Sequence, residues 1–408
     1  MGIKFVHTAD WQLGARFTQF GANADGLRRV RLDTLGRALS VAKDAGVDAF
    51  LIAGDLFEDS QVDDALIRAT LNIFARFPEV PVFILPGNHD PNTRPGSIWS
   101  RKPFTNRPAH VTVLAEPVVC EVAGAYLIAA PLKQKISTTD PSLRIAELAK
   151  DLPPDRVRIG VTHGALAIPG KHQPNDFPIH LEAASRAVLD YLAVGHWHTW
   201  QICDNGRLVM PGTPEPDAFD QDGSGHLALV EIAGRGATPQ VQQIPVGSLE
   251  WVMVTVDLVE AEAAKSSLQE KLSGLLPKAA HSVLRVVLRG GVSPRLLEEF
   301  RQWLEPVLQP FPVVQVVDET TVALLPAEFA ELQRSHPLLA LAVADLAQIE
   351  HLAATVPLPP GIDAATAISL AEAQQLLAAG KIELPKLDSE FFKQAHRLLF
   401  QKLQEASR

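Results

Sequence analysis

The first half of the chain alternates short apolar runs with stretches in which apolar residues recur at helical spacing. The short runs are rich in β-branched and aromatic residues and predict strands, at residues 3–6, 49–53, 82–85, 157–161 and 191–194. Between them, apolar residues that recur with the period of a helix predict helices, at Leu32, Leu35, Leu39 and Ala42 and again at Leu66, Ala69, Leu71 and Phe74. Strands that alternate with helices predict an α/β fold.

The pattern changes after about residue 247. Strands are predicted at residues 251–256, 283–288 and 313–317, and helices at 261–276 and 294–308, which together describe a compact α+β unit. The remaining residues are rich in Ala and Leu and predict helices, interrupted by a stiff Pro-Leu-Pro-Pro-Gly linker at 357–361. We therefore expect three regions, at residues 1–247, 248–326 and 327–408.

Each strand-like run in the first region leads directly into a motif rich in Asp, Asn or His. The motifs are HTADWQ from residue 7, GD from residue 54, GNHD from residue 87, THG from residue 162 and GHWH from residue 195. Loops at the carboxyl ends of strands in an α/β sheet converge on one edge, where ligand sites lie. Strand ends that all carry oxygen or nitrogen ligands therefore predict a single metal site.

The residue types fit a centre of two metal ions. Such a centre holds its ions about 3.5–4 Å apart, so one carboxylate has to bridge them. Asp55 follows a glycine that leaves room for close approach, and it is the predicted bridge. One ion is expected to be completed by Asp10 and His198, and the other by Asn88, His163 and His196. Mixed ligation without Cys suits Mn²⁺, Fe or another borderline-to-hard ion better than a structural zinc site, with Mn²⁺ as the first choice and Mg²⁺ as an alternative.

His89 follows the predicted ligand Asn88 directly. Its imidazole is expected to face the substrate rather than an ion, and so to act as a general acid or to orient a phosphate.

These motifs resemble the calcineurin-like metallophosphoesterase superfamily, and within it the SbcD and Mre-type nucleases of DNA repair. The phrases that carry the resemblance are HTADW with LG after it, LIAGDLF from residue 51, PGNHD from residue 86, and GHWH followed by PGTP from residue 211. The resemblance covers roughly residues 1–247. It implies a four-layer fold, a β-sandwich flanked by helices, as the nuclease domain. It also implies an α+β capping domain at 248–326 and a helical partner-binding region at 327–408.

One position departs from the family pattern. The family's first motif is Asp-x-His, and Gln12 stands here at the third position. A neutral imidazole nitrogen is a better ligand for a transition metal than an amide oxygen, although a Gln oxygen can coordinate a hard cation. Gln12 is thus expected to make the first metal site weaker, or else to hydrogen-bond a water that an ion holds. An active enzyme is still expected, because the other motif positions are intact.

The resemblance implies a metal-dependent DNA exonuclease, with endonuclease activity as a further expectation, working as a subunit with an SMC-like ATPase of the SbcC type. Within the same fold, the alternative is a phosphodiesterase or phosphatase for small substrates. A capping-like domain and a helical tail argue against that alternative. A third interpretation is a weakly active subunit that binds DNA ends, with Gln12 as the first sign of lost catalysis.

The C-terminal segment 387–407 carries a helical apolar stripe. Its members are Phe391, Phe392, Ala395, Leu398, Leu399 and Leu403. Packing into the chain's own core and docking onto a partner are about equally common uses of such a stripe. The resemblance implies docking onto the coiled-coil base of an SbcC-like ATPase.

Composition narrows the picture further. The chain of 408 residues has a formal net charge of −10, which argues against a protein that coats nucleic acid but not against a nuclease whose ions neutralise phosphates. Its two cysteines, Cys120 and Cys203, are too few for a disulfide framework. No apolar run approaches the length of a membrane span. A cytoplasmic protein is expected, and a homodimer is left open.

Other polar residues have structural interpretations. The Arg-Arg-Val-Arg sequence at 28–31 could contact phosphates, but solvated arginines on an exposed helical face are commoner. His172 and His180 are expected to be exposed loop residues. Asp90 is expected to hold the loop around Asn88 through backbone hydrogen bonds.

Overall fold

The computed structural model describes residues 2–93, 96–324 and 326–355, together with residues 394, 395, 398, 399 and 402. The chain divides into two compact units. The first comprises Met1–Val252 with His281–Val283, and the second Met253–Ala280 with Leu284–Arg408. The expected boundaries at residues 247 and 326 stay predictions.

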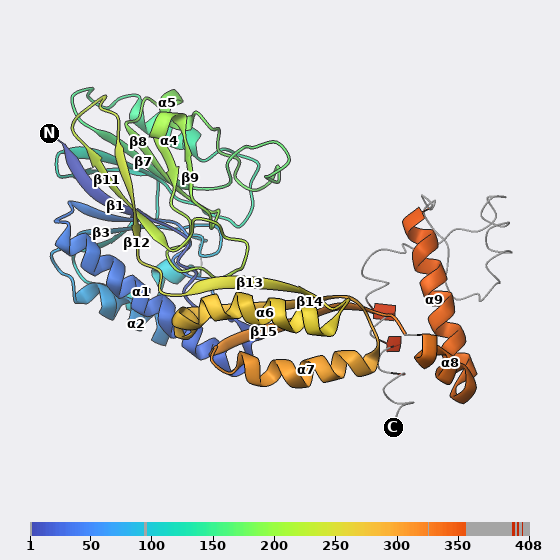
Figure 1. The fold of residues 1–408 in the computed structure, drawn as a ribbon. Coiled ribbons are helices and arrows are strands. Elements are labelled where there is room, and N and C mark those ends of the chain that lie inside the picture. Colours follow the sequence, from blue (N-terminus) through green and yellow to red (C-terminus); the bar gives the residue numbers. More distant parts are fainter. Residues whose placement is uncertain are drawn as a thin grey trace, which may run out of the picture. The chain divides into compact units, whose positions relative to one another are not determined.

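Two six-stranded sheets form the first unit (Figure 1). The strand order of one sheet is β12 (Gln240–Pro245), β11 (His226–Ile232), β1 (Ile3–Thr8), β2 (Ala49–Ala53), β3 (Val82–Leu85) and β4 (Val111–Val113). The order of the other is β5 (Val118–Val122), β6 (Ala125–Ala130), β7 (Arg158–His163), β8 (Tyr191–Gly195), β10 (Leu208–Met210) and β9 (Gln201–Cys203). The five predicted strand runs are β1, β2, β3, β7 and β8, and all are confirmed.

Helices cover the outer face of each sheet. The first sheet is covered by α1 (Ala24–Asp44), α2 (Asp64–Ala75) and α3 (Lys102–Thr105), and the second by α4 (Ser142–Ala149) and α5 (Ala183–Arg186). Short 3-10 helices lie in the connections, at η1 (Thr18–Asn23), η2 (Ile98–Ser100) and η3 (Asp204–Gly206). Leu35 and Leu39 of α1 are fully buried against the first sheet, as their spacing predicted.

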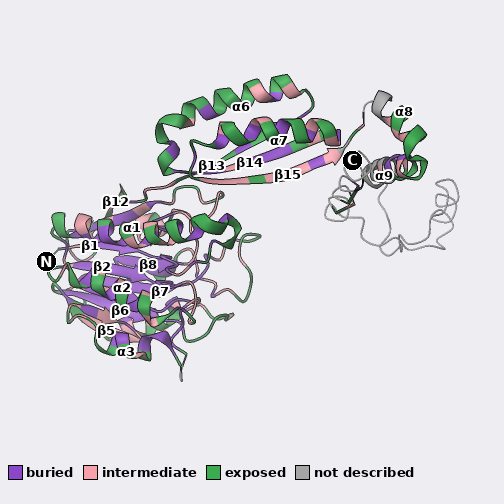
Figure 2. Ribbon diagram, turned by 90° about the horizontal axis from the view of Figure 1, so that it is seen from below, coloured by how far each residue is buried: buried purple, intermediate pink, exposed green. Residues whose placement is uncertain are grey.

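A third apolar layer lies between the two sheets. Phe5 and Leu51 from the first sheet pack with Val161 and Tyr191 from the second, and all four are nearly or completely buried. Figure 2 shows this buried interior running through the strands of the first unit. Helix, sheet, sheet and helix give the four-layer sandwich that the motifs predicted.

A three-stranded sheet follows, in the order β13 (Glu250–Asp257), β14 (Ser282–Val292) and β15 (Val313–Val322). It belongs to the second unit except for the first residues of β13 and β14, which are part of the first unit. Two helices, α6 (Ala261–Leu275) and α7 (Pro294–Leu308), alternate with these strands, and a 3-10 helix, η4 (Leu276–His281), follows α6. The alternation of strands and helices predicted for residues 251–317 is confirmed. Ser293 caps α7, because its side chain accepts a hydrogen bond from the Leu296 backbone N–H.

Helices continue in the predicted helical region, with α8 (Pro326–Ser335) and α9 (Pro337–Thr355). The predicted linker at 357–361 and most of the predicted stripe at 387–407 lie outside the described residues. Of the stripe, Leu398 is 58% exposed, whereas Leu399 is 8% exposed and packs with Val343 of α9. Across the described part of the chain, every helix falls short of the length and apolarity needed to cross a membrane.

Strand register aligns the motifs. Thr8 pairs with Ile52, Ala53 with Leu85, and His163 with Gly195. The strands therefore end level with one another. The expectation of a single sheet edge is wrong in one respect, because β1, β2 and β3 belong to one sheet while β7 and β8 belong to the other. The motifs meet where the carboxyl ends of two facing sheets come together.

Candidate metal centre

The first two motifs are joined through left-handed backbone. Asp10, Gln12 and Asp55 have φ values of 55°, 44° and 53°. The Asp10 N–H donates to the Gly54 carbonyl at 3.2 Å, and the Gln12 N–H donates to the Asp55 carbonyl at 3.1 Å. Such backbone conformations are costly in residues other than glycine and cluster at functional sites. The strand ends thus turn sharply and direct both carboxylates to one place.

Glycines make the close packing of this region possible. A Cβ atom on Gly54 would lie 2.1 Å from His163 Nδ1, and one on Gly87 would lie 2.1 Å from Asp55 Oδ1. Gly54 also has a φ of 96°. The Gly-Asp and Gly-Asn-His-Asp motifs therefore need glycine because the side chain of His163 or Asp55 occupies the space of a Cβ.

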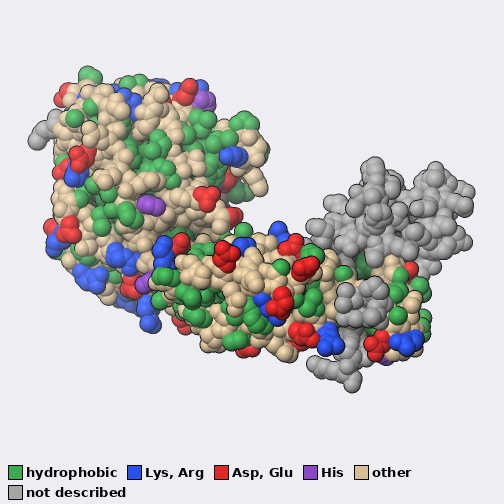
Figure 3. Space-filling model, viewed as in Figure 1, with side chains coloured by type: hydrophobic (Ala, Val, Ile, Leu, Met, Phe, Trp, Pro, Cys, Tyr) green, Lys and Arg blue, Asp and Glu red, His purple; other side chains and the backbone are tan. Residues whose placement is uncertain are grey.

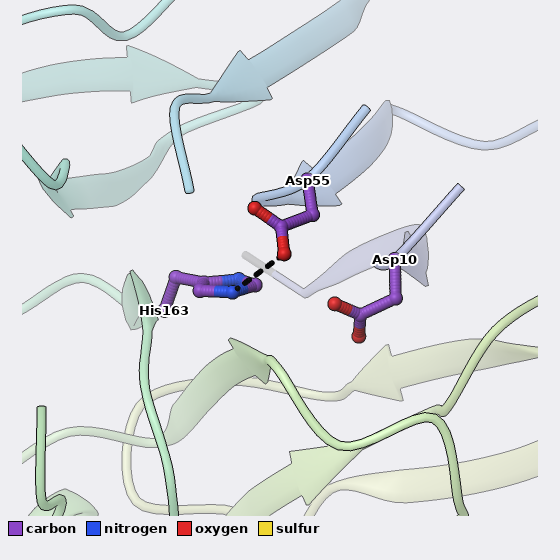
Figure 4. A group of neighbouring side chains, drawn as sticks. All are labelled: Asp10, Asp55 and His163. Atoms are coloured by element: carbon purple, nitrogen blue, oxygen red, sulfur yellow. Dashed lines mark ion pairs between the residues drawn. The ribbon is translucent and has the colours of Figure 1, made fainter. Parts of the chain in front are cut away.

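Asp10, Asp55 and His163 form the centre of the cluster (Figure 4). One ligand atom from each lies within 4.8 Å of the other two, and all three side chains are buried. His163 Nε2 lies 3.2 Å from Asp55 Oδ2. Asp10 Oδ2 accepts a hydrogen bond from the His196 N–H at 3.0 Å. Asp10 Oδ1 is buried and has no hydrogen-bond partner among the described residues.

A second group meets at the side-chain oxygen of Asn88. His163 Nε2 lies 2.8 Å from Asn88 Oδ1, and His196 Nδ1 lies 3.0 Å from the same atom. The two imidazole rings are 5.3 Å apart and nearly perpendicular. The ligands predicted for one ion therefore converge on a single oxygen.

Gln12 and His198 lie together on another side of Asp55. Gln12 Nε2 is 3.3 Å from Asp55 Oδ2 and 3.5 Å from His198 Nε2. Gln12 Oε1 is buried without a hydrogen-bond partner in the described part of the chain. These contacts and those at Asn88 bring all seven residues predicted as ligands into one cluster.

In each of the three histidines, the ring nitrogen that points away from the cluster contacts an oxygen of the protein. His163 Nδ1 lies 2.8 Å from the Ala53 carbonyl, His196 Nε2 lies 2.8 Å from Asp176 Oδ2, and His198 Nδ1 lies 3.1 Å from Asp217 Oδ1. An acceptor beside one ring nitrogen keeps the proton there and leaves the other nitrogen free to bind a metal. In all three rings the free nitrogen faces the cluster.

Charge interactions inside the cluster are strong in the metal-free protein. Burial lowers the pKa of His163, but the charge and hydrogen bond of Asp55 outweigh it and raise that pKa to about 9. Burial likewise opposes protonation of His198, whereas Asp217 raises its pKa to about 9. Burial by itself would raise the pKa of Asp55, but His163 and His89 hold it below its usual value. Burial raises the pKa of Asp10.

The donor set fits divalent cations. Carboxylate oxygens, an amide oxygen and neutral imidazoles are the ligands that Mn²⁺ and related ions accept. A buried carboxylate oxygen without a donor, such as Asp10 Oδ1, is costly unless a cation compensates its charge. The residues present thus match the chemistry of a metal centre.

His89 and Asp90 shape the loop beside the cluster. The His89 N–H donates to Asp55 Oδ1 at 2.9 Å, and His89 Nδ1 lies 2.8 Å from the Glu58 carbonyl. The Asp90 carboxylate accepts hydrogen bonds from the Gly87 and Phe57 N–H groups at 2.8 and 3.0 Å. The structural role predicted for Asp90 is therefore confirmed. Burial, with the Asp55 charge, raises the pKa of Asp90 to about 7.

Comparison with known proteins identifies a family for this part of the chain. The family described as Calcineurin-like phosphoesterase matches residues 3–200. The chain carries a calcineurin-like phosphoesterase domain. This domain makes the protein a metal-dependent phosphoesterase, and so a hydrolase, as the motifs predicted.

Relatives of the phosphoesterase domain include bacterial nuclease subunits. The chain is 24% identical over 267 residues to the SbcD subunit of the nuclease SbcCD of Bacillus subtilis, covering 56% of this chain and 66% of that protein. It is 27% identical over 301 residues to the Rhodobacter capsulatus protein of the same name, covering 60% and 69%. The match thus spans about two thirds of the length of each relative. Among solved structures, purple acid phosphatase PPD1 from yellow lupin seeds matches with a TM-score of 0.36 and 12% identity, over 60% of this chain and 52% of that one.

Sequence reasoning missed several residues around the phosphoesterase site. Asp176 and Asp217, which hold His196 and His198, follow no strand run and lie in loops. Arg31 was assigned to a solvated face, and this is wrong, because its side chain is 2% exposed. Arg31 stands one helical turn before Leu35 and two before Leu39 on the buried stripe of α1, and that spacing could have revealed it. His172 hydrogen-bonds the Ile168 carbonyl of its own loop instead of joining the cluster.

Proposed function

We propose that this chain is a metal-dependent nuclease that hydrolyses phosphodiester bonds of DNA, acting as an exonuclease and also as an endonuclease. The observation that carries the proposal is the convergence of the His163 and His196 imidazoles on Asn88 Oδ1, with His163 Nε2 also 3.2 Å from Asp55 Oδ2. Two relatives, each matched over more than half of this chain, are named as nuclease subunits. The alternative of a small-substrate phosphatase uses the same metal chemistry and is separated from a nuclease only by its substrate.

We assign two divalent ions to the cluster, with Mn²⁺ as the best match to the ligands. Asp55 would be shared between them. Asp10, Gln12 and His198 would hold one ion, and Asn88, His163 and His196 the other. When bound, the ions would polarise the phosphate oxygens and activate water for in-line attack.

His89 is assigned to the substrate. Its Nδ1 faces the Glu58 carbonyl at 2.8 Å and so carries a proton, which leaves Nε2 for the phosphate. A second proton on Nε2 could be donated to a non-bridging oxygen or to the leaving oxygen. The His89 backbone N–H is bound to Asp55 Oδ1, which fixes the imidazole beside the metal ligands.

Local positive charge supports a DNA substrate. Figure 3 shows Lys and Arg side chains gathered over α1 and α2 on the first unit, although the whole chain has a formal charge of −10. The N-terminal half of α1 adjoins the cluster, since Arg31 contacts the carbonyl of Trp11. Arg29 on the same part of α1 is exposed. Such residues can hold phosphates without reading sequence.

Comparing two substrates tests the proposal. The purified chain with Mn²⁺ should degrade linear duplex DNA faster than it hydrolyses a chromogenic phosphodiester at equal concentration of scissile bonds. Chelator should stop both reactions. The opposite preference would favour the small-substrate phosphatase. DNA binding without turnover in Mn²⁺, Mg²⁺ and Co²⁺ would instead favour the weakly active subunit that binds DNA ends.

A matched pair of variants tests His89. His89→Ala should keep metal binding but lower DNA cleavage by about 10²–10⁴-fold, the range for a general acid–base group. His110→Ala is the control, because the His110 ring bonds the Phe74 carbonyl at the end of α2 and belongs to no motif. Cleavage by His89→Ala at the rate of the control would remove His89 from the mechanism.

A partner belongs to the same proposal. We infer that the C-terminal segment predicted to be helical docks onto an SbcC-like coiled-coil ATPase, as the names of the relatives suggest. Leu398 is exposed and is available to a partner, whereas Leu399 packs with Val343 of this chain. Leu398→Asp should abolish co-purification with the ATPase and leave the unfolding temperature unchanged. Leu399→Asp should lower the unfolding temperature. Loss of fold in both variants would contradict docking through Leu398.

A cytoplasmic location completes the proposal, in keeping with the low cysteine count.

A further inference from the structure

Arg31 is a buried cation beside the cluster, and it reaches two separate segments of the site. Its Nε and Nη2 atoms donate to the Trp11 carbonyl at 2.9 and 2.7 Å. Trp11 stands between Asp10 and Gln12, whose backbone is left-handed on both sides of it. The guanidinium therefore fixes the peptide that carries these two side chains.

The same guanidinium holds the turn that faces His198. Arg31 Nη1 donates to the Glu215 carbonyl at 2.7 Å, and Nη2 donates to Thr213 Oγ1 at 3.2 Å. Nη2 also lies 3.5 Å from the Asp217 carboxylate. Asp217 in turn holds His198 Nδ1 at 3.1 Å, so Arg31 acts on this ligand through one carboxylate.

Lysine could not replace this arrangement. Arginine presents five N–H donors in a rigid planar fork, whereas lysine offers a single ammonium on a flexible stem. The fork of Arg31 bonds acceptors on two segments that are about 200 residues apart in the chain. A buried arginine also needs a compensating charge, which Asp217 supplies.

The other half of the cluster is held differently. His196 is aimed by Asp176, which is 31% exposed and stands on a surface loop. That loop is placed by backbone hydrogen bonds, from the Ala165 N–H to the Asp176 carbonyl and from the Ser137 N–H to the Asn175 carbonyl. The contacts that the structure gives for this loop and for His163 involve no arginine.

We infer that Arg31 and Asp217 are positioning residues for one half of the metal site, the half formed by Asp10, Gln12 and His198. This inference rests on the proposed two-ion centre. Arg31 sets the position of the first motif, and Asp217, held by Arg31, sets the ring of His198. Loss of either residue weakens one ion and leaves the ion at Asn88, His163 and His196 in place.

Metal binding by the full chain tests the inference. Titration calorimetry with Mn²⁺ would give the number and affinity of ions, and electron paramagnetic resonance would report whether two ions are coupled. Arg31→Lys should bind one ion as the parent does, and bind the second about 10–100-fold more weakly, the usual effect of disturbing an outer partner of a ligand. The spin coupling should be lost at Mn²⁺ concentrations that saturate the parent.

Arg158→Lys is the matched control. Arg158 is 7% exposed, and its guanidinium donates to the carbonyls of Leu152 and Pro153. It begins β7, while His163 ends the same strand. Replacing it disturbs another buried arginine, at the other end of the sheet, so both ions should bind as in the parent.

A second variant tests the same inference in case Arg31→Lys fails to fold. Asp217→Asn keeps the shape of the side chain and leaves Arg31 bonded to carbonyls, and it too should weaken one ion selectively. If Arg31→Lys or Asp217→Asn binds two ions with the parent's affinities, the inference is wrong, but the proposed function still stands. A parent chain that binds no Mn²⁺ would overturn the proposed function, and the inference with it.

Discussion

Gln12 donates a hydrogen bond to the carboxylate of Asp55, with 3.3 Å between Nε2 and Oδ2. This contact joins the one unusual residue of the first motif to the predicted bridging ligand. In this orientation the amide presents N–H groups to Asp55 and to His198, and its oxygen is the buried atom without a partner among the described residues. A half-turn of the amide exchanges the two atoms and would present the oxygen as a ligand. In either orientation Gln12 offers a weaker ligand than an imidazole.

Gln12→His should therefore tighten the weaker ion. The imidazole would replace an amide beside Asp55 and His198, and we expect its affinity to rise by about 10–100-fold, the scale on which ligand surroundings change metal binding. Calorimetry with Mn²⁺ measures the effect. Gln61→His serves as the control, because Gln61 is exposed and belongs to no motif. Two ions of equal affinity in the parent, unchanged in Gln12→His, would contradict the predicted asymmetry.

Metal binding should release protons. The pKa of His163 and that of His198 are both raised to about 9 in the metal-free protein, so at pH 7 each ring holds a second proton. A ligand imidazole has to be neutral, so each ion displaces a proton. Affinity should rise with pH up to about 9, roughly tenfold per pH unit for each proton displaced.

Calorimetry in buffers of different ionisation enthalpy would count these protons. The observed heat of Mn²⁺ binding at pH 7 should vary with the buffer, and the variation should vanish above about pH 9. Heats that are the same in every buffer would mean that both rings are already neutral before the ions bind.

Gly54→Ala should damage the site more than a similar change elsewhere. The new Cβ would lie 2.1 Å from His163 Nδ1, at a φ of 96°. Gly46→Ala is the control, because Gly46 also has a positive φ, of 61°, but a Cβ there would meet no described atom within 4 Å. In the control, the free energy of unfolding should fall only by what a left-handed backbone costs a residue with a Cβ atom, about 1–2 kcal/mol. Gly54→Ala should lose more stability and also Mn²⁺ binding. Equal losses in the two variants would show that His163 can move aside.

His7 should make the first unit sensitive to acid. Its ring is fully buried beside the Tyr191 hydroxyl, and burial lowers the pKa of His7 to about 3 from 6.5. Between these values the unfolded chain takes up a proton at His7 and the folded chain does not. The free energy of unfolding should therefore fall as the pH drops from 6.5 towards 3, by about 1.4 kcal/mol per pH unit from this group.

Urea unfolding of the metal-free protein at about pH 4 to 7 would isolate this effect. His7→Gln should have a shallower pH dependence than the parent, whereas His281→Gln, at an exposed position, should match the parent. Parallel curves for the parent and His7→Gln would show that His7 is protonated inside the fold.

The strands and motifs could be predicted from the sequence because both are local. Runs such as 49–53 and 82–85 are short, apolar and followed closely by Asp or Asn, and the structure contains them as β2 and β3. The division of these strands between two sheets could not be derived from the pattern, since the pattern of a buried strand is the same in either sheet. The layered sandwich came from the resemblance of the motifs.

The residues that orient the predicted ligands could not be predicted from the sequence, for a different reason. Asp176 reaches His196 from 20 positions away, and Asp217 reaches His198 from 19 positions away, each from a loop without regular periodicity. Arg31 can be predicted to be buried only if its position on the apolar stripe of α1 is given more importance than its charge. A buried charge breaks the rule that helical stripes are apolar, and such exceptions gather where a site needs support.

The contacts across the cluster also bear on when the site can exist. Asn88 and His163 are 75 positions apart, Asn88 and His196 are 108 apart, and Asp10 and His196 are 186 apart. Closing loops of this length is slow and comes late in folding. During synthesis, a nascent chain that ends before residue 198 lacks one of the imidazoles, however well β1, β2 and β3 have formed. The full set of predicted ligands is therefore available only after β8 has been made, so a complete two-ion centre could not act as a template for β1, β2 and β3.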